Sequence, residues 1–199
     1  MNNNHAGRLQ QVSHKMFHDW LVWGLVPLAA CIVLTLLVQG YVGQLAVTER
    51  QLEIRFQMVF AVAAALFLLG FSLDSQWTNH QKLAKRIAAA ALAALDGDSK
   101  RPPRLRPADL LVHSDIAFSS ILTSTLALTI IGAAIGVVAI IAAAVGLGLT
   151  YAVMMILLSV SYQIFVFSRQ AYYKEVMALA DEGKLVVEVK DDEDTKKKS

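Results

Sequence analysis

The longest uncharged stretch of the chain runs from Phe118 to Phe167, where Asp, Glu, Lys, Arg and His are all absent. A helix needs about 20 apolar residues to cross the hydrocarbon core of a bilayer. The stretch is therefore long enough for two spans, and the glycines between Ala142 and Gly148 predict a tight hairpin that joins them. A core element of a soluble domain would carry some charge over a run of this length. The pattern predicts an integral membrane protein.

Two further apolar runs predict two more spans, one at about Trp20–Gly40 and one at about Phe56–Leu73. Ahead of the first run, apolar residues recur at spacings of three and four, which is the period of one helix face. Because the other face is polar, this segment is expected to lie in the membrane interface. The predicted fold is an all-α integral membrane protein with four transmembrane helices, an N-terminal interfacial helix and short cytoplasmic helical extensions.

These boundaries divide the chain into five segments. They are an N-terminal interfacial segment (1–19), a first transmembrane hairpin (20–73), a cytoplasmic basic helix with a proline-rich linker (74–117), a second transmembrane hairpin (118–168) and a cytoplasmic helix end with a charged tail (169–199). The helical pattern that begins at Ser75 is expected to continue without a break to Leu95. Its last nine residues, from Ile87, are apolar but too short to span, so another helix, another subunit or the membrane surface must cover them.

Charge then suggests an orientation. Lys and Arg occur seven times in residues 74–117 and seven times after Ser168, but only twice between the first two spans. The positive-inside rule places both termini and the middle segment in the cytoplasm, which agrees with an even number of spans. The predicted location is the cytoplasmic (inner) membrane of a bacterium. Net charge is +2, so nucleic acid is an unlikely partner.

The third span is rich in small and hydroxyl-bearing residues, which let helix backbones approach closely and hydrogen-bond across the contact. Helix packing, within the chain or between subunits of a homo-oligomer or larger complex, is the predicted role of six residues: Gly132, Gly136, Ala139, Ala143, Gly146 and Thr150. A hydrated pore is the alternative, and three residues are its candidate lining: Ser124, Thr125 and Thr129. The sequence leaves both interpretations open.

The sequence contains no recognisable catalytic or cofactor-binding motif. Asp19, Asp74 and Asp115 fall at the expected ends of spans, so no carboxylate is predicted inside one. His14 and His18 have helical spacing, but no third metal ligand lies near them in the sequence. No enzyme, cofactor or metal site is predicted. The basic linker is expected to face anionic lipid headgroups through Lys100, Arg101, Arg104 and Arg106.

Two hypotheses of function follow. The first is a non-enzymatic subunit of a multi-protein membrane assembly of the secretion, conjugation or defence type, acting through helix–helix packing. The second is an oligomeric ion channel or pore-forming protein lined by the third span. The lipid bilayer is a partner in both.

Overall fold

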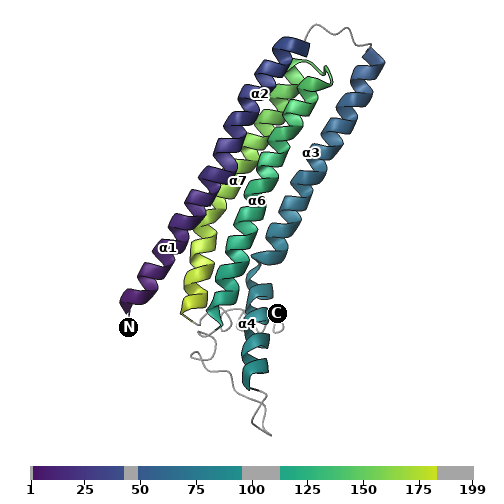
Figure 1. Ribbon diagram of the computed structural model, residues 1–199. Helices are drawn as coiled ribbons and strands as arrows, with labels where there is room; N and C mark the ends of the chain where they lie inside the picture. The colour runs from purple at the N-terminus through teal and green to yellow at the C-terminus, as the bar shows by residue number, and fades with distance from the viewer. Residues whose placement is uncertain (1, 43–48, 96–112, 183–199) are drawn as a thin grey trace. The chain divides into compact units, whose positions relative to one another are not determined.

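The computed structural model describes residues 2–42, 49–95 and 113–182, and all of its secondary structure in these ranges is helical. Figure 1 labels the helices along the chain. Their bounds are α1 Asn2–Trp20, the π-helix η1 Leu21–Leu25, α2 Val26–Val42, α3 Glu49–Trp77, α4 His80–Leu95, α6 Ser114–Ala144 and α7 Leu149–Asp181.

Four helical stretches are long and apolar enough to cross a membrane, which confirms the prediction of an all-α chain with four such helices. They are Leu9–Val42, Arg50–Trp77, Ser114–Ala144 and Leu149–Asp181. The N-terminal segment forms no separate helix, because α1 continues through η1 into α2. Its placement in the membrane interface stays a prediction.

A π-helical turn, η1, lies directly before Val26 and Pro27. The N–H of Val26 donates to the carbonyl of Leu21, which is the long i→i−5 bond of a π-helix. Proline has no N–H to donate and its ring crowds the preceding turn. A wider turn directly before Pro27 accommodates both effects, so the helix continues through the proline.

The chain divides into two compact units. The span unit consists of Met16–Leu73 and Thr125–Ser168, and the helix-end unit consists of Met1–Lys15, Asp74–Ser124 and Arg169–Ser199. Several helices pass from one unit into the other, so the division does not follow helix ends.

Helix α6 forms the centre of the span unit. In its most apolar window 56% of the residues are buried, against 17% for α3 and 22% for the first span. One core cluster joins α3, α6 and α7 through Val59, Ala139 and Met155, and a second joins α6 and α7 through Ile135 and Tyr162. From Leu21 to Val42 the first span buries only a narrow stripe, namely Gly24, Leu28, Cys31 and Thr35.

The predicted hairpin between the third and fourth spans is present as a four-residue connection from Val145 to Gly148. The N–H of Gly146 donates to the carbonyl of Ala143, and the N–H of Leu147 to that of Ala142, both at 3.1 Å. Together with the left-handed backbone of Gly146 (φ 75°), these bonds make a Schellman ending of α6. Gly148 is also left-handed, with φ 81°.

The helix-end unit corrects one expectation. The helix predicted to continue from Ser75 to Leu95 breaks at Thr78 and Asn79, and α4 begins at His80. The side-chain oxygen of Asn79 accepts hydrogen bonds from the backbone N–H groups of Gln81 (3.0 Å) and Lys82 (3.3 Å). This N-cap stabilises a new helix start at His80, and helical periodicity alone does not reveal such a cap.

Other helices of the same chain cover one face of α4. Leu83, Ala84, Ile87 and Ala91 are buried in the helix-end unit together with α6 and α7 residues such as Ile121 and Met177. Part of the apolar run that required a cover therefore has one within the chain.

We expect Gly148→Ala to destabilise the protein and Gly40→Ala not to do so. A Cβ at either position meets nothing within 4 Å, so the two substitutions differ only in backbone conformation. Alanine in the left-handed region of Gly148 costs about 1 kcal/mol, whereas alanine within α2 favours the helix. Unfolding in mild detergent, followed by circular dichroism, measures both. Equal midpoints for the two variants would contradict the proposed geometry of the turn.

Candidate functional site

Gln163 of α7 is the polar centre of the span unit. Its side-chain amide nitrogen donates to the backbone carbonyl of Thr129 on α6 at 3.1 Å, and its own backbone carbonyl accepts a 3.3 Å hydrogen bond from the Trp20 indole. The side chain is 1% exposed. A buried amide without partners costs several kcal/mol in an apolar medium, so these bonds favour one arrangement of the helices.

Two glycines make room for this amide. A Cβ at Gly24 would lie 2.8 Å from the Gln163 side-chain oxygen, and a Cβ at Gly132 would lie 2.5 Å from its nitrogen. Any side chain at either position would push the amide away from the Thr129 carbonyl. Gly24 belongs to η1, so the π-helical turn brings the bare backbone of the first span against Gln163.

The contact continues along α6. The Ser159 hydroxyl donates to the carbonyl of Gly132 at 2.7 Å. A Cβ at Gly136 would lie 3.3 Å from that hydroxyl and 3.4 Å from the Cys31 sulfur. The two glycines of the predicted packing strip therefore face α7 and α2 of the same chain.

The remaining residues of the predicted strip lie in different surroundings. Ala139 and Ala143 are fully buried in the span unit. Gly146 lies in the hairpin, and Thr150 is exposed near the start of α7. The α6 residues of the strip therefore lie in helix contacts, whereas Gly146 lies in the turn and Thr150 at an exposed position.

The three candidate pore residues are all buried: Ser124 and Thr129 have no exposed area and Thr125 is 1% exposed. The Thr129 hydroxyl donates to the Thr125 carbonyl at 2.7 Å, and the Thr125 hydroxyl lies 3.9 Å from the Met16 sulfur. Ser124 belongs to the helix-end unit. The four basic residues expected at lipid headgroups, Lys100, Arg101, Arg104 and Arg106, lie outside the described residues.

A buried charge cluster in the helix-end unit was not foreseen. Asp74 lies in the last turn of α3, near the end of a span as predicted, and is 4% exposed. One of its carboxylate oxygens lies 3.0 Å from the Arg169 guanidinium. The other accepts hydrogen bonds from the Tyr173 hydroxyl at 2.5 Å and from the Thr78 hydroxyl at 2.9 Å. The carboxylate therefore has a partner on each oxygen.

Aromatic rings extend this cluster. The Arg169 guanidinium carbon lies 4.2 Å from the centroid of the Tyr172 ring, and the His80 ring stacks on Tyr172 with centroids 5.0 Å apart. The Tyr172 hydroxyl donates to the Thr78 carbonyl at 3.1 Å. The cluster thus joins the end of α3, the start of α4 and the middle of α7. Its ion pair, hydrogen bonds and stacked rings suit a structural clamp.

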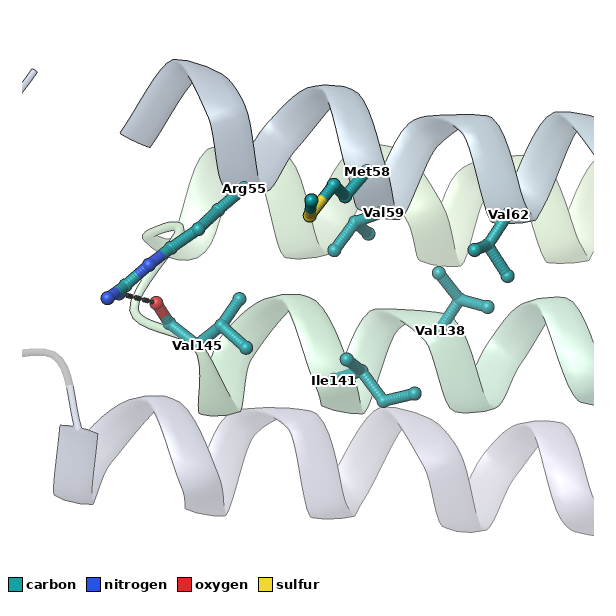
Figure 2. Close-up of a pocket in the computed structure, with 7 residues that line it drawn as sticks. All are labelled: Arg55, Met58, Val59, Val62, Val138, Ile141 and Val145. Carbon is teal, nitrogen blue, oxygen red and sulfur yellow. Dashed lines mark hydrogen bonds between the residues drawn. The ribbon is translucent and has the colours of Figure 1, made fainter. Parts of the chain in front are cut away.

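A third feature is an apolar cleft of about 270 Å³ between α3 and α6 (Figure 2). Six apolar side chains line it: Met58, Val59, Val62, Val138, Ile141 and Val145. Arg55 is its one polar lining residue and reaches from α3 to the Val145 carbonyl, to which it donates at 2.6 Å.

The end of α6 explains why Arg55 bonds to the Val145 carbonyl. The Schellman bonds satisfy the carbonyls of Ala142 and Ala143 but leave that of Val145 at the end of α6 without a helical partner. A cation is also favourable at the negative end of a helix dipole. Arg55 therefore caps α6 and lies at the end of the cleft.

No protein-family model matches the chain, and no similar curated protein or solved structure was found. Among the described residues, no group of three or more His, Cys, Asp or Glu side chains is arranged to hold a metal ion. Any proposal of function therefore depends on the geometry of the described residues.

We expect Asp74→Asn to lower the free energy of unfolding by about 2–4 kcal/mol. The amide oxygen of Asn can still accept from Tyr173 and Thr78, so the main loss is the charge opposite Arg169. Chemical unfolding in detergent measures the change.

A double-mutant cycle identifies the cause. Asp74→Leu combined with Arg169→Met removes both charges, and the pair should cost clearly less than the sum of the single changes. Additive costs would show that the two residues do not interact.

Proposed function

We propose that this protein is a non-enzymatic, multi-pass subunit of a larger assembly in the cytoplasmic membrane of a bacterium, with both termini in the cytoplasm. An assembly of the secretion, conjugation or defence type fits this proposal. The orientation rests on the distribution of Lys and Arg along the chain.

One observation carries the proposal: α4 has a face that the described residues of the chain leave exposed. Lys82, Lys85 and Arg86 are exposed at its start, and Ala89, Leu92 and Ala93 are exposed one to two turns later. These positions recur at spacings of three and four, so they share one side of the helix. A helix that is basic and then apolar along one face suits a partner protein that covers the apolar end and offers acidic groups to the basic end.

The charge cluster supports the same proposal by holding α4 in place. Asn79 caps the start of the helix, and Thr78, directly before it, bonds to Asp74. His80, the first residue of α4, stacks on Tyr172 of α7. A docking helix anchored at its first turn loses less conformational freedom on binding than a free one.

The channel alternative has less support. A pore needs hydroxyls that face water, but Thr125 and Thr129 are buried against neighbouring helices of the span unit. Gly132 and Gly136 are likewise occupied by α7 and α2. Opening a path along these side chains would require separation of the helices that Gln163 and Ser159 join.

The particle mass in mild detergent tests the proposal. We expect wild-type protein from native membranes to run as a complex larger than one chain. The double variant Ala89→Glu/Leu92→Glu places two charges on the docking face and should reduce the particle to a single chain without lowering its unfolding midpoint. Lys174→Glu, at an exposed position of α7, is the matched control and should keep the wild-type mass.

Two outcomes would contradict the proposal. The first is an unchanged particle mass in the Ala89→Glu/Leu92→Glu variant. The second is ion flux through wild-type protein in proteoliposomes, abolished by Thr129→Val, which would favour the channel.

A further inference from the structure

We propose that the cleft between α3 and α6 is a binding site for one glycerophospholipid, with an acyl chain in the cleft and the lipid phosphate on Arg55. This inference is independent of the proposed function, because it concerns the span unit and not the face of α4.

The shape and lining of the cleft suit an acyl chain. Met58 and Val62 on α3 and Ile141 on α6 each keep between 47% and 67% of their area exposed, so the cleft is open along its length to the surroundings of the helices. From Arg55 to Val62 the cleft follows α3 for seven residues, or about 10 Å at the rise of an α-helix. Its other lining side chains are aliphatic, so a hydrocarbon chain finds matching contacts there.

Arg55 determines which apolar molecule fits. The guanidinium carries a full positive charge and five N–H donors, of which the Val145 carbonyl uses one in a 2.6 Å bond. That bond holds the guanidinium across the space between the two helices at the end of the cleft, as Figure 2 shows. Its remaining donors match phosphate oxygens in geometry and charge. A charged group at one end and an apolar chain behind it are the two parts of a phospholipid.

Three other charged residues lie near this end of α3, namely Glu49, Arg50 and Glu53. Glu53 is exposed two residues before Arg55, and residues two apart on a helix point to different sides. Arg50 is also exposed but does not line the cleft, so it separates a general attraction of lipid from binding in the cleft.

A second helix is the competing occupant. The lining of the cleft disfavours a helix. A helix laid along it would place apolar side chains against the charged guanidinium of Arg55, and burying that charge without a partner is costly. A phospholipid supplies that partner. Binding of an added lipid to a single chain distinguishes the two occupants.

Native mass spectrometry of the full-length, delipidated protein provides the test. The probes are dioleoyl phosphatidylglycerol, dioleoyl phosphatidylethanolamine and the phosphate-free dioleoyl glycerol. We expect one high-affinity site for each phospholipid. Arg55→Met should weaken it about tenfold, the value of one charge-assisted hydrogen bond, while Arg55→Lys keeps most of the affinity. Dioleoyl glycerol should bind weakly and equally to wild-type protein and Arg55→Met.

A second variant tests the cleft without changing Arg55. Val62→Phe fills the end of the cleft away from Arg55 and should weaken binding of all three lipids. The matched controls are Arg50→Met, an exposed arginine near the same end of α3, and Val137→Phe, an exposed valine of α6 that does not line the cleft. Both controls should bind like the wild type. Equal effects of Arg50→Met and Arg55→Met, or wild-type binding by Val62→Phe, would overturn the proposal.

Discussion

The hydrogen bond from the Gln163 side chain to the Thr129 carbonyl is the contact on which the rest of the span unit depends. In a bilayer, a polar group that lacks a partner within the protein has no water to replace it. The side-chain nitrogen of Gln163 meets this constraint through the Thr129 carbonyl, and the Gln163 backbone carbonyl bonds to Trp20. The side-chain oxygen lies against the bare backbone of Gly24 and has no hydrogen-bond partner among the described residues. Gly24 and Gly132 are therefore best understood as space for one amide, and Gly136 as space for Ser159 and Cys31.

Charge obeys the same constraint in the helix-end unit. A carboxylate as buried as that of Asp74 is stable only with partners, and Arg169, Tyr173 and Thr78 supply them. Removing one partner of a buried ion pair costs more free energy than forming the pair contributes. The cluster therefore acts mainly by disfavouring helix arrangements in which the Asp74 carboxylate has no partner. The cluster also joins the turn before α4 to α7. The partners that bury Asp74 therefore also hold the start of α4, whose other face is exposed.

The apolar pattern was enough to predict the helical class and four helices long enough to cross a membrane, because a run such as 118–167 has few other stable solutions. The hairpin followed from its glycines. The sequence could not reveal the break before α4, since Asn79 acts through a side-chain cap that depends on local geometry. It also could not reveal the pairing of Asp74 with Arg169, which are far apart in the chain.

The candidate site was less predictable than the fold. Gly132 and Gly136 were singled out from the sequence, but small residues suit an internal contact, an oligomer and a pore equally well. Their surroundings depend on where Gln163, Ser159 and Cys31 lie, and helical period alone does not fix the rotation of one helix against another. The signals available in the sequence were an amide, Gln163, on one apolar helix and a glycine pair, Gly132 and Gly136, on another.

Water access to Thr129 tests the central claim most directly, namely that the Thr125 and Thr129 hydroxyls of the third span are sealed between helices of the span unit. In a Cys31→Ser background, Thr129→Cys and the exposed control Arg50→Cys would be exposed to a membrane-impermeant thiol reagent in proteoliposomes opened to both sides. We predict rapid labelling of Arg50→Cys, and labelling of Thr129→Cys only after denaturation. Labelling of both at similar rates in the folded protein would show a water path along α6 and contradict the claim.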